Sequence, residues 1–231
     1  MKYSSATISP EDYLQLLTKK FTETGDPVRA EQQRAYMKHQ FEYCGLGAPQ
    51  WMAMAKEIFA AHGMYTGKQL EQFIKLCFDQ EYREIQYLSL EMMQRMLLEQ
   101  NKTWIRVLER CITTHSWWDT VDWLAKLVGM HFKRFPELQH EYAFKWIASD
   151  NMWLQRVAII HQLLYRENTD EKLMYEMIRQ VADSKEFFLR KASGWALRQY
   201  AKTNPTSVEK FLAKTNLSNL SVREARTQLD K

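Results

Sequence analysis

A short pattern returns at a nearly fixed interval along the chain and limits the folds that the chain can adopt. Arg-x-Ala occurs at Arg156, Arg190 and Arg223, which are 34 and 33 residues apart. Each copy follows a cap-like Asp or Ser, and a small Ala beside a charged residue at a fixed offset is typical of stacked helix pairs. The interval is shorter than the roughly 40–47 residues of HEAT repeats, so it indicates a HEAT-like α-solenoid. A chance recurrence is the alternative, because the chain is rich in both residues.

Composition supports an all-α fold of this kind. The 231 residues include only 7 glycines and 5 prolines, whereas helix-favouring Met, Leu, Gln, Glu, Lys and Arg are abundant. Hydrophobic residues make up 45% of the chain, which is enough for a continuous core. We therefore expect one curved domain over residues 1–231, made of about a dozen helices in antiparallel pairs. One helix of each pair would line its concave face.

Prolines and capping residues predict where the helices begin. A Ser, Asp or Asn before the first turn, or a Pro within it, satisfies or removes backbone donors that have no partner there. Gly129 is expected to end the helix that follows the two tryptophans. The turn Tyr43–Pro49 contains two glycines, which suits either a plain connection or a close backbone approach. The predicted starts are Ser9-Pro10, Asp26-Pro27, Pro49, Thr66 (a capping box with Gln69), Pro136, Ser149-Asp150, Asp170, Ser184, Pro205 and Ser221.

Several classes of function are excluded by what the chain lacks. It has no Gly-rich phosphate loop, no H-E-x-x-H, no G-x-S-x-G and no Cys/His pair with metal-ligand spacing. Its three cysteines, Cys44, Cys77 and Cys111, are expected to be reduced and buried. No apolar run is long enough to cross a bilayer, and the first residues contain no apolar signal core. We expect a cytoplasmic monomer that uses no metal and no cofactor.

The stretch Ser116–Asp122, S-W-W-D-T-V-D, is the strongest candidate for a functional site. On a helix, residues four apart share a face, so Trp118 and Asp122 would point the same way. An indole face attracts a cation through its quadrupole, and a carboxylate attracts it through its charge. The pair would therefore bind positive charge. The structural alternative is that the tryptophans pack in the core and that Asp122 caps a helix or pairs with a nearby Arg.

A basic stripe is predicted on the helix that starts at Ser184. Lys191, Trp195, Arg198 and Lys202 are spaced so that they fall on one face. The net charge of +4 is mildly basic and permits binding to nucleic acid without requiring it. A stripe of cations with one tryptophan suits a polyanion, although a helix that contacts a protein can look similar.

Long strings of the chain match a known family. The sequence resembles the AlkD-type DNA alkylation-repair glycosylases, which are HEAT-like solenoids. The similarity covers nearly the whole chain and weakens toward Ala35–Lys38 and Ser221–Ala225. The strings that carry it are S-W-W-D-T-V-D (116–122), K-W-I-A-S-D-N-M-W-L-Q-R (145–156), S-K-E-F-F (184–188) and G-W-A-L-R-Q-Y-A-K-T-N-P (194–205).

The resemblance implies excision of N3- and N7-alkylated purines from duplex DNA, with the damaged base left stacked. Trp118, Asp122 and Trp195 would form the catalytic wall. Arg156 and Arg198 would hold phosphates near the lesion, and Tyr36 would lie nearby. The turn Gly45–Ala48 differs from relatives that carry polar side chains there, so its contact with the opposite strand stays open.

The chemistry that the resemblance implies agrees with the residues. An alkylated purine is cationic and leaves readily, and the sugar then carries positive charge as in glycoside hydrolysis. Asp122 and the two indoles can stabilise that charge, and Asp122 can position water. No lysine stands out as a Schiff-base nucleophile, so we expect a monofunctional glycosylase. The alternatives are a non-catalytic relative that binds DNA and a protein-interaction scaffold.

Overall fold

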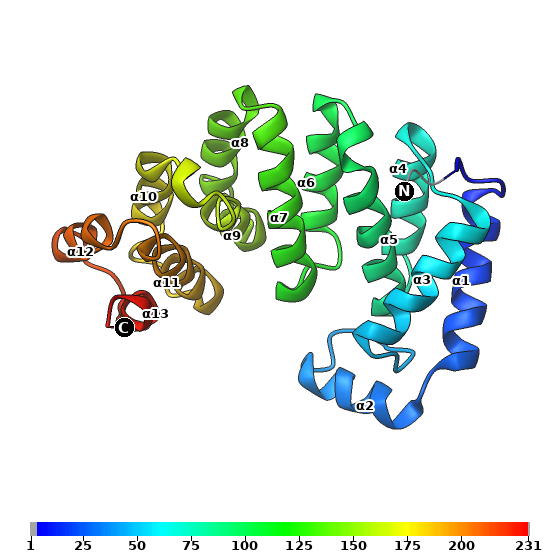
Figure 1. Cartoon of the computed structure of the whole chain (residues 1–231). Helices are drawn as coiled ribbons and strands as arrows, with labels where there is room; N and C mark the ends of the chain where they lie inside the picture. The colour runs from blue at the N-terminus through cyan, green and yellow to red at the C-terminus, as the bar shows by residue number, and fades with distance from the viewer. Residues whose placement is uncertain (1–3, 231) are drawn as a thin grey trace. The chain divides into compact units, whose positions relative to one another are not determined.

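This computed structural model describes residues 4–230, and thirteen α-helices make up most of them (Figure 1). The β structure of these residues is limited to two isolated bridges. The predicted all-α class is confirmed. The chain divides into two compact units between Asn101 and Lys102. The first unit contains α1 (Pro10–Thr24), α2 (Pro27–Tyr36), α3 (Ala48–His62), α4 (Gly67–Phe78) and α5 (Arg83–Met96). The second contains α6 (Ile105–Thr113), α7 (Trp118–Arg134), α8 (Glu137–Ile147), α9 (Met152–Ile160), α10 (Glu171–Gln180), α11 (Phe187–Ala201), α12 (Pro205–Lys214) and α13 (Asn219–Leu229).

Most of the helix starts follow the predicted capping residues. The side chains of Ser9, Asp26 and Asp170 each accept a hydrogen bond from a backbone amide in the first helical turn. Thr66 precedes α4 but makes no side-chain cap hydrogen bond, so the predicted capping box is wrong. Asn151 caps α9 in place of the Ser149-Asp150 pair, and Ser218 caps α13 in place of Ser221.

The glycine-containing turn of the first unit wraps around a buried carboxylate. Glu84 is fully buried and accepts hydrogen bonds from the backbone amides of Cys44, Gly45 and Leu46 at 2.9–3.0 Å. A Cβ on Gly45 would lie 2.0 Å from the carbonyl oxygen of Asp26, and the residue has φ of 89°. The close backbone approach that the glycines permit is therefore made within the protein itself.

In the second unit each helix packs on a helix from the neighbouring pair. Helix α7 contacts α6 and α9, and α11 contacts α9 and α13 (Figure 1). Phe132 of α7, Trp146 of α8 and His161 after α9 meet in the core, with Phe132 and His161 ring centroids 5.3 Å apart. Burial lowers the pKa of His161 to about 4, so its ring is neutral at physiological pH.

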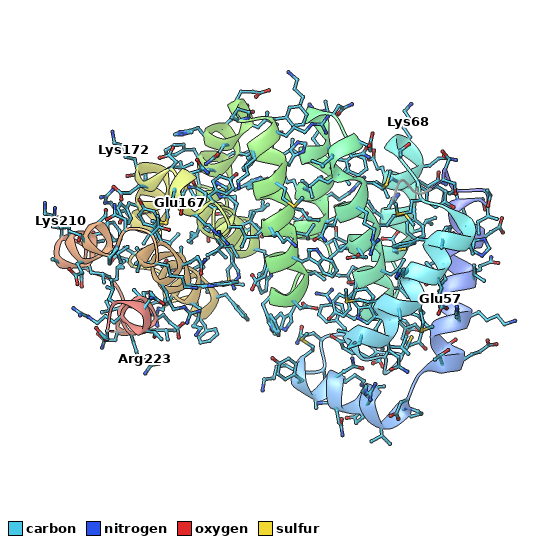
Figure 2. All side chains as sticks on the ribbon, in the orientation of Figure 1. Glu57, Lys68, Glu167, Lys172, Lys210 and Arg223 are labelled. Atoms are coloured by element: carbon cyan, nitrogen blue, oxygen red, sulfur yellow. The ribbon has the colours of Figure 1, made fainter. Side chains whose placement is uncertain are left out.

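In the recurring Arg-x-Ala pattern, the alanines share one environment and the arginines do not. Its arginines differ in exposure and in partners. Arg156 is buried, Arg190 donates to the Ser184 carbonyl oxygen at 2.9 Å, and Arg223 is exposed on α13, where its side chain projects outward (Figure 2). The pattern therefore reports helix packing rather than a row of surface charges. Its alanines are all buried: Ala158, Ala192 and Ala225.

Two glycines allow neighbouring helix pairs to approach closely. Gly129 lies inside α7, so the prediction that it ends the helix is wrong. A Cβ there would lie 2.2 Å from the His161 carbonyl oxygen. A Cβ on Gly194 of α11 would lie 2.7 Å from the Ser221 carbonyl oxygen. Each glycine sits where the next pair's backbone crosses, which explains why a helix-weakening residue stands mid-helix.

The prediction of reduced, buried cysteines is confirmed. All three cysteines are buried thiols, and burial raises the pKa of Cys44 to about 12. Within the described residues, none of the helices combines the length and the apolar character that crossing a bilayer requires.

Candidate functional site

Asp122 and Arg156 form a bidentate ion pair between α7 and α9. The Arg156 Nε donates to Oδ1 of Asp122 at 2.8 Å, and Nη2 donates to Oδ2 at 2.9 Å. The remaining nitrogen, Nη1, donates to the Phe188 carbonyl oxygen at 2.7 Å. The Arg156 side chain is 6% exposed and that of Asp122 is 20% exposed. The planar fork of arginine therefore fixes both carboxylate oxygens, with the carboxylate at the surface side of the pair.

Opposing effects act on the Asp122 carboxyl. Burial raises its pKa, and the hydrogen bonds and positive charge of Arg156 lower it. Burial is the larger effect, so the pKa of Asp122 lies above the ordinary value for an aspartate. The carboxylate nevertheless keeps lone pairs that Arg156 does not use, because each oxygen can accept two hydrogen bonds.

Trp195 of α11 completes a three-helix arrangement. The Arg156 guanidinium carbon lies 5.9 Å from the Trp195 ring centroid and 5.8 Å from that of Phe188. The guanidinium therefore links a carboxylate on α7 to an indole on α11. The structural alternative, in which Asp122 pairs with an Arg, is present here together with the predicted grouping of Asp122 and Trp195.

The two adjacent tryptophans have different environments. Trp117 packs against Trp153 and Phe188, with centroid distances of 5.8 and 5.4 Å, and so belongs to an aromatic cluster behind the ion pair. Trp118 is the first residue of α7 and is half-buried, one turn before Asp122 on the same helix face. The predicted alignment of Trp118 with Asp122 follows from α7, and Trp117, also half-buried, has the aromatic packing role.

A cavity of about 260 Å³ lies beside this group, with Asp122 on its α7 wall and Trp195 on its α11 wall. Lys126 and Lys133 follow Asp122 along the same wall, and Lys133 Nζ lies 4.5 Å from the Tyr165 ring centroid. Among the described residues, Trp118 is outside the lining of this cavity. The rest of the lining is mainly apolar and includes Met130, Ile160, Leu163, Leu164 and Tyr165.

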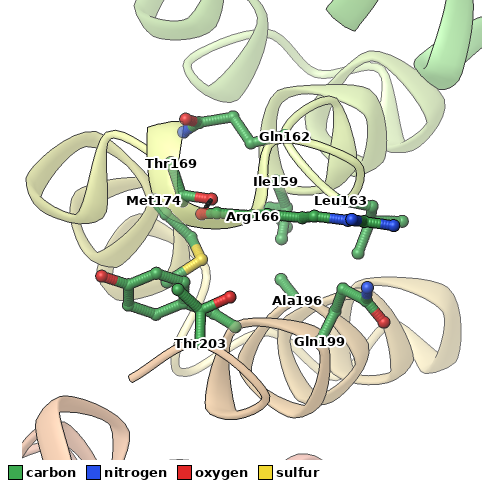
Figure 3. Close-up of a pocket in the computed structure, with 10 residues that line it drawn as sticks. Ile159, Gln162, Leu163, Arg166, Thr169, Met174, Ala196, Gln199 and Thr203 are labelled. Carbon is green, nitrogen blue, oxygen red and sulfur yellow. Dashed lines mark hydrogen bonds between the residues drawn. The ribbon is translucent and has the colours of Figure 1, made fainter. Parts of the chain in front are cut away.

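A second, much smaller pocket adjoins the first. It has a volume of about 10 Å³, which suits a single water at most. Figure 3 shows Leu163 and Gln199 facing each other across it, and both residues also line the larger cavity. Arg166 also lines it, and its side chain extends toward Leu163 (Figure 3). The larger cavity, which contains Asp122, is therefore the better candidate for a ligand site.

The predicted basic stripe lies on α11, and its first cations are already paired. Lys191 Nζ lies 2.6 Å and Arg198 Nη1 lies 3.0 Å from the two carboxylate oxygens of Glu224 on α13. The hydrogen bond from Lys191 is the main cause that lowers the pKa of Glu224, so this carboxyl is ionised at neutral pH. Lys202 is exposed and donates to the Gln199 side chain at 2.9 Å.

Arg156 and Tyr36 differ in how they relate to the predicted site. All three Arg156 nitrogens donate within the protein, which favours a role in holding Asp122 over the phosphate contact that the resemblance implied. Tyr36 ends α2 in the first unit and is 68% exposed. Its nearness to the lesion stays a prediction.

Sequence reasoning missed three charged residues. Lys126 and Lys133 follow Asp122 by four and eleven positions, the same spacing that revealed the α11 stripe, so this signal was available. Glu224 lies on a different helix, and only its offset of 33 residues from Lys191, one repeat period, connects the two in the sequence.

Fold and site together define a helical-repeat protein with a carboxylate–guanidinium–indole group beside a cavity. A family model described as DNA alkylation repair enzyme matches residues 17–229, and the chain belongs to this family. The match supports a role in the repair of alkylated DNA.

Solved structures agree with the family. A predicted DNA alkylation repair enzyme from Enterococcus faecalis is 30% identical, with a TM-score of 0.85 over 90% of this chain and 97% of that one. AlkD2 from Streptococcus mutans is 15% identical, with a TM-score of 0.64 over 96% and 98% of the two chains. This second likeness shows the fold alone. A search of curated proteins gives no match.

Proposed function

We propose that this protein is a DNA glycosylase that hydrolyses the N-glycosidic bond of cationic N3- and N7-alkylated purines in duplex DNA. The observation that carries the proposal is the Asp122 carboxylate, held at both oxygens by Arg156 and bordering a cavity together with Trp195. The family match supports alkylated DNA as the partner.

The reaction needs little beyond charge stabilisation. The alkylated base leaves with the electron pair of the bond between its nitrogen and C1′, and so loses its positive charge. The sugar then carries a developing cation, which Asp122 stabilises from a fixed position and the indoles of Trp118 and Trp195 stabilise through their faces. Water adds its oxygen to C1′, and its proton passes to Asp122 or to solvent.

Arg156 acts as a positioning residue in this scheme. A carboxylate that rotates freely would spread its charge over many orientations, whereas one held at both oxygens presents its remaining lone pairs in one direction. The pair is neutral overall, so stabilisation of the sugar depends on how much closer the carboxylate lies to it than the guanidinium does.

DNA would be held by its phosphates through cations of the second unit. Arg198 and Lys191 of α11 and Lys202 directly after it are the predicted contacts, and Lys126 and Lys133 join them as cations on the cavity wall. As the resemblance implies, the damaged base would stay stacked instead of entering the pocket that most glycosylases use.

The direct test is release of free base from methylated duplex DNA. The wild-type protein should release 7-methylguanine and 3-methyladenine and leave an abasic site without cutting the strand. Because Lys126 lines the cavity, borohydride trapping should accompany the assay, and a covalent protein–DNA adduct would refute the monofunctional assignment.

One observation favours a second candidate, a relative that binds DNA without chemistry. Arg156 already neutralises Asp122, as would suit a purely structural ion pair. That candidate predicts salt-sensitive binding to duplex DNA, and no release of base from methylated substrate at any protein concentration.

A further inference from the structure

Glu224 occupies the place between two cations of the α11 stripe. Its Oε1 accepts from Lys191 Nζ at 2.6 Å and its Oε2 accepts from Arg198 Nη1 at 3.0 Å. The Glu224 side chain is 17% exposed, while those of Lys191 and Arg198 are 37% and 35% exposed. One carboxylate thus bridges two partly exposed cations that stand two helical turns apart.

The approach of α13 to α11 is built into the packing. Gly194 lies between Lys191 and Arg198, and a Cβ there would lie 2.5 Å from the Glu224 Cβ. The Ser221 hydroxyl donates to the Arg190 carbonyl oxygen at 2.9 Å. Ala225 beside Glu224 is fully buried. These contacts hold the carboxylate against the stripe, so the ion pairs are not a chance encounter of long surface side chains.

A carboxylate and a phosphodiester present similar chemistry to such a site. Each carries one negative charge shared between two oxygens that accept hydrogen bonds from Lys and Arg. Two cations that one carboxylate can bridge therefore form a site into which the two non-bridging oxygens of a DNA phosphate fit.

We propose that the Glu224 carboxylate occupies the Lys191–Arg198 site in the absence of DNA and that a DNA phosphate displaces it on binding. This inference rests on the proposed function, because it takes DNA as the polyanion. Glu224 then keeps the two cations in position while it weakens binding to any duplex. It also lowers the number of phosphate charges that the protein neutralises on binding.

The test is a titration of a short unmodified duplex by fluorescence anisotropy at several salt concentrations. Glu224→Gln keeps the shape of the side chain and removes its charge. We expect it to tighten binding roughly fivefold, because Lys191 and Arg198 are both released from a partly buried carboxylate. The slope of log affinity against log salt should steepen by about one unit. Glu224→Asp, which keeps the charge with a shorter reach, should show a smaller increase.

The matched control is Glu109→Gln. Glu109 pairs with Lys145 at 2.7 Å between α6 and α8, so this variant also removes one negative charge and releases a lysine in the same unit. Its binding should stay close to wild type. In a background of Lys191→Gln with Arg198→Gln, the Glu224→Gln change should have no effect, and thermal melts should confirm that each variant is folded.

The outcomes separate this inference from the proposed function. If the wild type binds DNA and Glu224→Gln binds equally or more weakly, the inference is wrong and the proposed function stands. Equal tightening by the Glu109 control would also overturn it, because net charge would then explain the gain. If no variant binds DNA at low salt, both ideas fail.

Discussion

At the residue scale, Arg156 decides what Asp122 can do. The guanidinium donates to both carboxylate oxygens and to the Phe188 carbonyl, so three groups from α7, α9 and α11 are held in one geometry. A lysine carries the same charge but has a single nitrogen, which cannot make a bidentate contact. Substitution by lysine therefore separates a positioning role from a purely electrostatic one.

We expect Arg156→Lys to lower the single-turnover rate of base release by roughly 100-fold, because small misplacement of a catalytic group has effects of this size. Its affinity for duplex DNA should change little. Arg179→Lys is the control, since Arg179 pairs with Glu176 at 3.5 Å on the surface of the same unit. Weaker DNA binding with an unchanged single-turnover rate would instead support the phosphate contact that the family resemblance implied.

The pH profile of base release should reflect the environment of Asp122. Burial raises the pKa of this carboxyl, and the proposed mechanism requires its ionised form. The rate should therefore fall as pH decreases through a midpoint above the ordinary aspartate range.

Arg156 opposes that rise, so Arg156→Gln should move the acidic limb of the profile to higher pH. Spontaneous depurination is subtracted with an Asp122→Asn reaction in parallel. An acidic limb at the same pH in both active proteins would show that Asp122 is not the titrating group.

At the element scale, the repeat period connects the site to the packing. The ion pair between Asp122 and Arg156 spans 34 residues, and that between Lys191 and Glu224 spans 33. Both pairs therefore join equivalent positions in successive repeats. The crossings at Gly129 and Gly194 serve the same packing, because each glycine admits the backbone of the next pair.

Gly129→Ala tests this packing. Alanine favours a helix more than glycine does, so an exposed helical site would gain stability. Here the new methyl group would meet the His161 carbonyl oxygen, and the helices must separate. We expect a loss of about 1–3 kcal/mol in the free energy of unfolding, measured by urea denaturation.

Gly47→Ala is the control for this measurement, because its nearest neighbour is the flexible end of Arg29 at 3.2 Å. A stability of Gly129→Ala equal to or above that of the wild type would contradict the close crossing.

The positions of the helices could largely be predicted from the sequence, whereas the contacts between residues of different helices could not. Prolines and N-caps act within a few residues, so Ser9, Asp26 and Asp170 were identified from sequence alone. Gly129 was misread because the reason for a glycine there is a carbonyl 32 residues away. Glu224 was missed for the same reason, since its contacts come from another helix.

At the scale of the whole molecule, the family match spans both units. It covers residues 17–229 and so crosses the boundary at Asn101. No Gly-, Ser- or Pro-rich linker stands at this boundary in the sequence. The expectation of one domain stays a prediction.

A single domain should unfold in one cooperative transition. Seven of the eight tryptophans follow residue 101, so tryptophan fluorescence reports mainly on the second unit, whereas far-UV circular dichroism reports on both. The two signals should give the same urea midpoint. Separate midpoints would show two domains that unfold independently.

We propose that Asp122, oriented by Arg156 beside Trp195, makes this fold a glycosylase. The most direct measurement is the single-turnover release of 7-methylguanine from methylated duplex DNA by wild type and Asp122→Asn, at protein concentrations that saturate the DNA. We predict release by the wild type and a rate at least about 100-fold lower for Asp122→Asn, the size of effect expected when a preorganised charge is removed. Equal rates for the two proteins, or no release by either, would contradict the claim.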